Sequence, residues 1–164
     1  MSMTDNPLKT ADLYDIHEEQ LQICSPVFRH FGGRHDFHGA IATLKCFEDN
    51  SLVRDQLAQP GEGRVLVVDA GGSLRCAMLG DQLAQLAVDN SWAGVVMFGC
   101  IRDALEISGM SLGVLALATH PRKSIKKGAG EVGGEVEFAG VKFRPGEWLY
   151  ADEDGVVVLD RPAV

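Results

Sequence analysis

Apolar residues in the first two thirds of the chain follow two patterns that alternate. Short, nearly continuous apolar runs bounded by glycine, proline or polar residues are typical of strands buried on both faces of a sheet. We expect such strands over residues 40–47, 64–69, 94–99 and 112–118. Segments with apolar residues at helical spacing lie before and between them, over residues 11–24, 50–59, 81–90 and 103–107. This alternation predicts parallel strands joined by right-handed helical crossovers.

The final third of the chain has a different, β-rich pattern. Short β-branched and aromatic runs predict strands over residues 135–138, 141–143, 148–150 and 156–159. Turn dipeptides separate them, at Ala139-Gly140, Pro145-Gly146 and Asp154-Gly155. No linker-like segment divides the two parts, so we expect one domain over residues 1–164. Its fold class is mixed α/β, with a largely parallel sheet, flanking helices and a β-rich C-terminal layer.

Length and charge exclude several classes of protein. The 164 residues suit one domain with a sizeable core. No apolar run approaches the length of a membrane span, and the polar N-terminus lacks the pattern of a signal peptide, which favours a cytoplasmic protein without membrane contact. The formal net charge of −8 argues against direct nucleic-acid binding. One basic cluster, within residues 122–127, is interpreted as a solvated loop, with an RNA-binding patch as the alternative.

Cysteine and histidine residues do not form an obvious metal motif. The four cysteines are scattered without a Cys-x-x-Cys pair, so we expect buried free thiols at Cys24, Cys46, Cys76 and Cys100. His35 and His38 lie close together, a spacing that would also suit metal ligation. The glycines at positions 32, 33 and 39 favour a turn between two elements at this point instead.

One set of charged residues has a spacing with geometric meaning. Asp81 begins a predicted helix, and Arg102 and Asp103 directly follow the next predicted strand. A helix of about ten residues climbs roughly 15 Å, and the strand then returns the chain to the same edge of the sheet. The three side chains can therefore meet at the carboxyl edge of the parallel strands, where α/β proteins commonly bind ligands.

The chemistry of this set suits an acidic substrate. The Asp103 carboxylate is a ligand type that Mg²⁺ and Mn²⁺ prefer, and the Arg102 guanidinium can pair with a carboxylate or a developing oxyanion. Asp81 can position a water or relay a proton. An anion cradle is expected from the backbone N–H groups of Gly80, Asp81, Gln82 and Leu83. A structural interpretation stays open, in which Asp81 only caps its helix and Arg102-Asp103 is a surface pair.

The motif Gly80-Asp81, twenty intervening residues, then Arg102-Asp103 resembles the signature of the 4-hydroxy-4-methyl-2-oxoglutarate aldolase family. This family also contains the proteins called regulator of ribonuclease activity A. The similarity covers nearly the whole chain, through residues 31–33, 45–50, 65–69 and 149–155. The N-terminal and KCFEDN segments are most similar to the ribonuclease regulators, whereas the charged set is similar to the aldolases.

The resemblance implies a fold and a reaction. It implies an α/β/α arrangement of the swivelling-domain type that assembles as a homotrimer, with sites near subunit boundaries. The implied enzyme is a carbon–carbon lyase, a class II aldolase that uses Mg²⁺ or Mn²⁺ to cleave 4-hydroxy-4-methyl-2-oxoglutarate into two pyruvates. Decarboxylation of oxaloacetate is the implied side reaction, because both reactions pass through a pyruvate enolate that the metal stabilises.

The resemblance also implies roles for individual residues. It assigns the metal to Asp103, positive charge beside the enolate to Arg102, and the water that shuttles protons to Asp81. Substrate binding is assigned to the backbone of residues 80–83. Asp152 and Asp154 are interpreted as part of a turn between two strands, with a role beside a neighbouring subunit's site as the alternative.

Two hypotheses from different classes follow. The first is a metal-dependent aldolase and decarboxylase that acts on a small 2-oxo acid. The second is a non-catalytic regulator that binds and inhibits a ribonuclease of the RNA-degradation machinery, because an acidic surface suits a basic partner. The two are compatible, since an enzyme can also carry a docking surface. A third interpretation is an α/β domain whose charged set is only structural.

Overall fold

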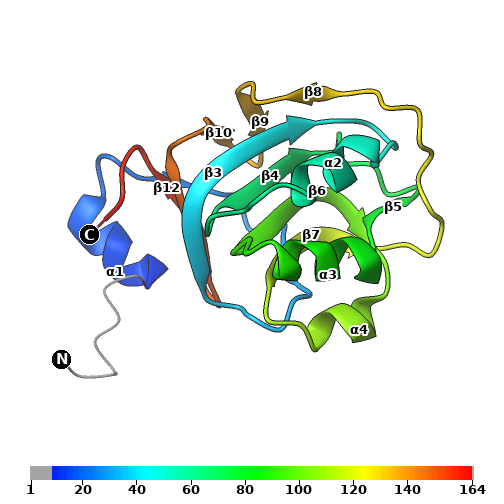
Figure 1. Cartoon of the computed structure of the whole chain (residues 1–164). Helices are drawn as coiled ribbons and strands as arrows, with labels where there is room; N and C mark the ends of the chain where they lie inside the picture. The colour runs from blue at the N-terminus through cyan, green and yellow to red at the C-terminus, as the bar shows by residue number, and fades with distance from the viewer. Residues whose placement is uncertain (1–8, 164) are drawn as a thin grey trace.

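The structure, a computed structural model, describes residues 9–163 and contains one large mixed sheet with three helices gathered on one face (Figure 1). The centre of the sheet is parallel, in the order β3 (Phe37–Lys45), β4 (Val65–Asp69), β6 (Gly94–Ile101) and β7 (Gly113–Thr119). The helices that follow β3, β5 and β6 are α2 (Ser51–Leu57), α3 (Asp81–Asp89) and α4 (Ala104–Ser108). The central strands follow one another in chain order, as the alternating pattern predicts.

Antiparallel strands extend the sheet on both sides of this centre. On the side of β3, the sheet continues through β11 (Trp148–Asp152), β12 (Gly155–Leu159) and β1 (Gln22–Ile23). On the other side, β2 (Arg29–His30) pairs with β7. Two short strands lie off this path: β5 (Ala77–Leu79) pairs in parallel with the end of β6, and β8 (Glu131–Val132) pairs with β3. The predicted mixed α/β fold class is confirmed. The sheet is parallel only at its centre, because the strands that extend it on both sides pair antiparallel.

Successive side chains of the central strands pack into two different cores, because they point to opposite faces of the sheet. Leu66 belongs to the core beneath the helices, whereas Val67 belongs to the core on the opposite face. That second face is covered by a hairpin of β9 (Val136–Phe138) and β10 (Val141–Phe143), and not by further helices. The resemblance implies helices on both faces of the sheet. In the structure, helices cover one face and a pair of strands covers the other.

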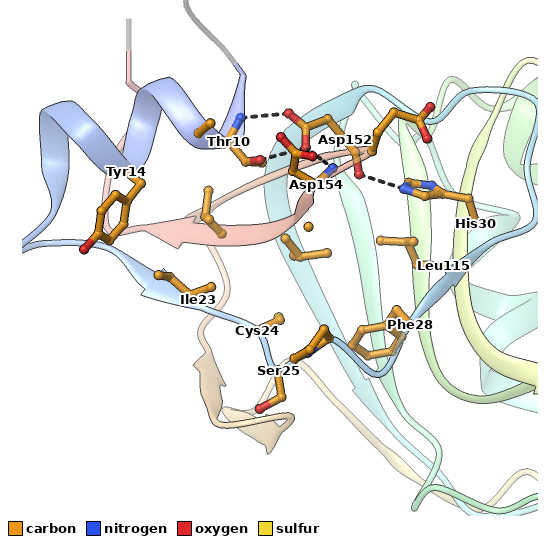
Figure 2. Close-up of a pocket in the computed structure, with 16 residues that line it drawn as sticks. Thr10, Tyr14, Ile23, Cys24, Ser25, Phe28, His30, Leu115, Asp152 and Asp154 are labelled. Atoms are coloured by element: carbon orange, nitrogen blue, oxygen red, sulfur yellow. Dashed lines mark hydrogen bonds between the residues drawn. The ribbon is translucent and has the colours of Figure 1, made fainter.

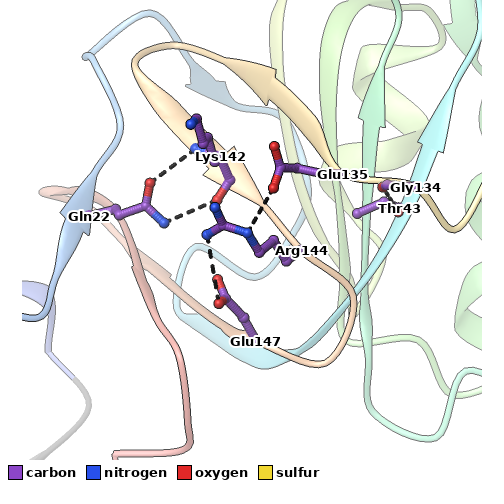
Figure 3. A network of polar contacts seen from close by, with 7 residues as sticks. All are labelled: Gln22, Thr43, Gly134, Glu135, Lys142, Arg144 and Glu147. Carbon is purple, nitrogen blue, oxygen red and sulfur yellow. Dashed lines mark hydrogen bonds and ion pairs between the residues drawn. The ribbon is translucent and has the colours of Figure 1, made fainter.

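Polar contacts hold the β9–β10 hairpin in place (Figure 3). The side chain of Gln22 exchanges two hydrogen bonds with the backbone of Lys142, each over 3.0 Å. Arg144 donates a hydrogen bond from Nε to Oε1 of Glu135 over 2.7 Å and lies near Glu147. The Gln22 contacts link β1 to the hairpin, and the Arg144 contacts join the residues that flank its two strands.

The N-terminal helix is shorter than the sequence pattern predicts. Helix α1 covers Thr10–His17, and residues 22–23 form β1 instead of continuing the helix to residue 24. Pairing with β12 satisfies the backbone of this segment, and Leu13 anchors α1 against Tyr150 and neighbouring apolar side chains. The non-local pairing overrides the local helical spacing at this point.

Several further expectations can be compared with the structure. All four cysteines are buried and free, as predicted. The turn expected around His35 and His38 is wrong at His38, which lies within β3 and stacks on Tyr150 of the adjacent strand. Short strands such as β5 and β8 lack a local signal, because two or three residues do not establish a period. Within residues 9–163, no helix is long and apolar enough to cross a membrane.

Candidate functional site

A cavity of about 270 Å³ opens at the carboxyl edge of the parallel strands. Its walls are formed by segments that follow β3, β5, β6 and β7, whose carboxyl ends lie at the same edge of the sheet. All residues that the sequence predicts for the site line this cavity: Gly80, Asp81, Gln82, Leu83, Arg102 and Asp103. The structure therefore brings together the two segments whose spacing suggested a common site.

The Asp103 carboxylate contacts the start of α3. The backbone N–H of Asp81 donates a hydrogen bond to Oδ2 of Asp103 over 2.9 Å. A Cβ atom at Gly80 would lie only 2.9 Å from the same oxygen. Position 80 must therefore be glycine for the carboxylate to approach the backbone this closely. Within residues 9–163, the other oxygen, Oδ1, accepts no hydrogen bond, and Asp103 lines the cavity.

The backbone of Asp103 adopts a conformation that is uncommon outside glycine. Its φ of 59° and ψ of 42° lie in the left-handed region, between the end of β6 and the start of α4. Aspartate tolerates this region better than most residues, because its short polar side chain can bond locally. The left-handed turn reverses the chain and brings the carboxylate to α3. Strain of this kind is often found at functional positions.

Arg102 is held by its backbone and leaves its charge exposed. Its N–H donates to the carbonyl oxygen of Leu79 over 2.9 Å, which continues the pairing of β5 with β6. Its Nη1 donates to the carbonyl oxygen of Pro121 over 3.2 Å. Within the described part of the chain, the guanidinium forms no ion pair with a carboxylate. Its positive charge is therefore available to an anionic ligand.

A buried carboxylate, Asp49, joins two loops beside the cavity. Oδ1 accepts hydrogen bonds from the backbone N–H and the hydroxyl of Ser51, and Oδ2 accepts from the backbone N–H groups of Lys127 and Ala129. Burial alone would raise the pKa of this carboxyl, but the four donors outweigh burial and hold the pKa well below its usual range. Asp49 thus stays ionised and fixes the loop after β7 to the start of α2.

This arrangement adds residues to the site that the sequence analysis missed. The loop after β7 and the start of α2 complete the cavity with Asn50, Arg54, Lys123, Ser124 and Lys126. The basic cluster was visible in the sequence and was interpreted as a solvated loop. It is an exposed loop, yet Lys123 and Lys126 also line the cavity.

The cavity is positively charged although the chain is acidic. Its lining contains four cationic side chains and two carboxylates, in a chain of formal net charge −8. The excess of positive charge attracts anions to this edge of the sheet. The cavity therefore suits a small acidic ligand.

The oxygen donors of the cavity fit a hard divalent cation. Mg²⁺ commonly binds through one or two carboxylates, with water and substrate oxygens completing its shell. The carboxylates of Asp81 and Asp103 line the cavity, and the latter is oriented by its hydrogen bond to the backbone. Among residues 9–163, no group of three or more His, Cys, Asp and Glu side chains is placed to hold a metal ion. A cation held here would therefore rely on water and substrate for most of its ligands.

A second cavity, of about 360 Å³, lies between α1, β12 and the chain around β2 (Figure 2). Asp152 receives hydrogen bonds there from the backbone and hydroxyl of Thr10, at 2.8 and 2.7 Å, and from the backbone N–H of Asp154. The interpretation of these aspartates as part of a turn between β11 and β12 is confirmed. The wall is mainly apolar and contains none of the charged site residues, so this cavity is a weaker candidate for acid chemistry.

His35 contacts groups that link the N-terminal segment to this turn. Its Nδ1 lies 2.8 Å from Oε1 of Glu153, and its ring stacks on His30 with centroids 4.4 Å apart. The ring nitrogen of His30 in turn contacts the carbonyl oxygen of Asp152 over 2.8 Å. These contacts give His35 a structural role near the second cavity.

Comparison with known proteins gives a consistent family. A family model described as RraA-like, Aldolase/RraA, matches residues 10–158. A relative from Aromatoleum aromaticum is 63% identical over 93% of this chain and 96% of its own length. A relative from Laribacter hongkongensis is 60% identical over 93% of this chain and 96% of its own length. Both carry the provisional name 4-hydroxy-4-methyl-2-oxoglutarate aldolase.

Two solved structures share the fold at high sequence identity. One, from Geobacillus kaustophilus, is described as an S-adenosylmethionine: 2-dimethylmenaquinone methyltransferase. It is 50% identical to this chain, with a TM-score of 0.93, and the match covers 94% of this chain and 96% of that one. The other is described as the RNA-processing inhibitor RraA from Thermus thermophilis; it is 47% identical, with a TM-score of 0.92, over 95% of this chain and 94% of that one. The descriptions of similar proteins therefore name three different activities.

Replacement of Gly80 by alanine should displace the Asp103 carboxylate. The new Cβ would conflict with Oδ2, so the hydrogen bond from Asp81 N–H should be lost, at a cost of about 1–2 kcal/mol in the free energy of unfolding. Chemical denaturation of a double-mutant cycle checks the cause: Gly80→Ala should cost clearly less in an Asp103→Ala background. Equal costs in the two backgrounds would show that the conflict lies elsewhere.

Asp49→Asn should lower stability in a pH-dependent way. At neutral pH the variant loses charge-assisted hydrogen bonds, and we expect about 2–3 kcal/mol less stability. Since the pKa of Asp49 is lower in the folded than in the unfolded chain, the wild-type advantage is complete above the unfolded value of about 4 and disappears as the pH falls through the folded value. Denaturation midpoints between acidic and neutral pH measure this difference. Asp55→Asn, an exposed change in α2, is the control, and a loss independent of pH would contradict the assignment.

Proposed function

The chain belongs to the RraA-like Aldolase/RraA family, and from this membership we propose that it is a carbon–carbon lyase acting on 2-oxo acids. The proposed reaction cleaves 4-hydroxy-4-methyl-2-oxoglutarate into two molecules of pyruvate, and decarboxylation of oxaloacetate is a second reaction of the same site. The observation that carries the proposal is the cavity in which Asp103, Arg102 and the start of α3 converge. The provisional names of the relatives support the same reaction class.

In this proposal, α3 and Arg102 bind the 2-oxo acid end of the substrate. Helical hydrogen bonding in α3 begins with Ala84 N–H, which donates to the carbonyl oxygen of Gly80 over 3.0 Å. The N–H groups of Gln82 and Leu83 precede it and have no acceptor within the helix. These N–H groups and the positive end of the helix dipole attract a carboxylate. The guanidinium of Arg102 adds a planar pair of donors beside them.

The chain's residues also account for the movement of charge and protons. When the hydroxy acid is cleaved, the C3–C4 bond breaks, its electron pair moves toward the C2 keto oxygen, and the C4 hydroxyl loses a proton. Arg102 stabilises the negative charge that develops on the keto oxygen. C3 of the new pyruvate then gains a proton. One proton leaves and one returns, so a single relay through Asp81 and a water is sufficient.

Decarboxylation of oxaloacetate follows from the same arrangement. The bond from C3 to the C4 carboxylate breaks, carbon dioxide leaves, and the electron pair of the broken bond moves toward the C2 keto oxygen. No substrate hydroxyl releases a proton in this reaction, so the relay through Asp81 passes a proton from solvent water to C3. The three-carbon product and the charge on its keto oxygen are identical in the two reactions. One site that holds this three-carbon unit can therefore serve both substrates.

Asp103 is the residue proposed to hold a divalent cation, because its carboxylate is oriented by the backbone and lines the cavity. A bound Mg²⁺ or Mn²⁺ would supply a Lewis acid for the keto group and the adjacent carboxylate of the substrate. The homotrimer and the cytoplasmic location implied at the outset stay predictions.

The methyltransferase description of the Geobacillus structure suits this cavity less well. The residues that line the cavity include no aromatic side chain on which an adenine ring could stack. The excess of cationic side chains would also repel a sulfonium group. The cavity therefore favours an acid over a sulfonium cofactor.

A second candidate function is regulation of a ribonuclease. It is favoured by the 47% identity to the Thermus RraA structure over nearly the whole chain. The net charge of −8 would assist docking to a basic protein partner. This function would use the outer surface, so it can coexist with the lyase activity.

Asp103→Asn should reduce metal-dependent pyruvate release by about 100-fold or more, because the change removes the negative charge that attracts the cation. Asparagine tolerates the left-handed backbone at this position, so the fold should be retained. Pyruvate release from both substrates is measured with Mg²⁺ and with excess chelator. Glu106→Gln, an exposed carboxylate in α4, is the matched control. Full activity of Asp103→Asn, or of the wild type in chelator, would contradict the proposal.

Regulation of a ribonuclease would require direct binding. If this second function holds, the protein should bind a purified ribonuclease of the RNA-degradation machinery and slow cleavage of a model RNA at physiological salt. Asp103→Asn should bind and inhibit equally well, because the outer surface is unchanged. Absence of both binding and inhibition would remove this candidate.

A further inference from the structure

The second cavity, between α1, β12 and the chain around β2, differs from the first in the charge of its wall (Figure 2). Among the described residues that line it, three carry carboxylates and none is a lysine or an arginine. The carboxylates belong to Asp152, Glu153 and Asp154, at the turn between β11 and β12. Their negative charge attracts cations and repels anions. The charge of this wall is therefore opposite to that of the first cavity.

One of these carboxylates is free to bind a cation. Asp152 accepts hydrogen bonds from Thr10 and from the backbone N–H of Asp154. Oε1 of Glu153 lies 2.8 Å from Nδ1 of His35. The carboxylate of Asp154 is exposed, and in the part of the chain that the structure describes it accepts no hydrogen bond and forms no ion pair. Asp154 therefore supplies an unpaired negative charge at the edge of the cavity.

The rest of the wall is mainly apolar and partly aromatic. The half-buried ring of Phe28 packs edge-on against Phe98 and Phe138, with centroids 6.4 and 5.8 Å apart, and these contacts fix its orientation. Tyr14 is 39% exposed, and its hydroxyl donates a hydrogen bond to Oε1 of Glu18 over 2.8 Å. Aromatic rings attract cations through their faces, and apolar walls bury a carbon skeleton. A carboxylate beside such a wall suits an organic ammonium ion.

His30, which also lines this cavity, lacks a hydrogen-bond donor. Its Nε2 lies 2.8 Å from the carbonyl oxygen of Asp152, which can only accept, so Nε2 carries the proton of the neutral ring. Nδ1 is then an acceptor, and it is buried without a partner in the described structure. Buried acceptors nearly always have a donor. The unpaired atom at this wall therefore also favours a ligand that donates hydrogen bonds.

We propose that this second cavity binds a small primary ammonium ion with an apolar body. The ammonium pairs with Asp154, and the body packs between Phe28, Tyr14 and the aliphatic side chains of the wall. A volume of about 360 Å³ is within the range of small-molecule sites. The two cavities share no lining residue, so the proposal is independent of the lyase function.

Three probes with a common phenyl group test the site by binding alone. At neutral pH, 2-phenylethylamine is a cation, 2-phenylethanol is neutral and phenylacetate is an anion. We expect calorimetric titration to show that the amine binds at least about tenfold more tightly than the alcohol, as one charge-assisted contact allows. Phenylacetate should bind more weakly than the alcohol. The affinity for the amine should fall as the salt concentration rises.

Two variants separate the contribution of charge from that of the apolar wall. Asp154→Asn should weaken binding of the amine about tenfold and leave the alcohol unchanged, because asparagine suits the same turn without the charge. Asp160→Asn is the matched control, since this exposed carboxylate lies outside the cavity. Ala11→Leu adds a larger side chain at an exposed position of the wall and should weaken binding of both ligands.

Several results would overturn this proposal. Equal affinity for the amine and the alcohol would show an apolar cavity without charge selection. Undiminished binding of the amine to Asp154→Asn or to Ala11→Leu would place the ligand elsewhere. If a second copy of the chain covers the cavity, the amine will not bind and Ala11→Leu will change the oligomeric state measured by sedimentation. Release of pyruvate, present or absent, does not alter any of these results.

Discussion

The buried carboxylate of Asp49 is the interaction on which the cavity edge of the sheet depends. Its two oxygens accept hydrogen bonds from Ser51 and from the backbone of Lys127 and Ala129, so one charged group joins the loop after β3 to the loop after β7. A buried charge without these donors would be strongly unfavourable. The two loops must therefore close around the carboxylate together, and the wall that carries Ser124 takes its position from a residue that does not line the cavity.

Backbone donors explain how an acidic chain builds a cavity for acids. Asp49 is surrounded by N–H and hydroxyl donors, and Asp103 accepts from Asp81 N–H. The arginine and lysine side chains at the cavity are thus not needed to compensate these carboxylates. The close approach of Asp103 to Gly80 has the same effect, because the backbone of α3 and not the guanidinium of Arg102 holds this carboxylate. The charge of Arg102 therefore stays exposed. Positive potential is concentrated locally despite a net charge of −8.

Sequence patterns predicted the parts of the molecule that have a local signal. Continuous apolar runs predicted the central strands, and helical spacing predicted α3. The spacing of the βαβ unit alone was sufficient to predict that Asp81 and Asp103 lie close together. The short strand β5 and the end of α1 could not be predicted, because each depends on pairing with a distant strand. Ser124 had no signal at all, since its place in the cavity wall depends on the fold of the loop after β7.

The sequence separation between Asp49 and its hydrogen-bond donors also determines when the cavity can form during synthesis of the chain. Asp49 and Ala129 are separated by 80 positions. At about 5–20 residues per second, roughly 4–16 s pass between the synthesis of one and of the other. During this interval the early strands can pair, but the carboxylate lacks half of its donors and the edge of the sheet stays open. The cavity is therefore completed late on the ribosome, and a nascent chain that has not reached Ala129 exposes a partly formed core without a binding site.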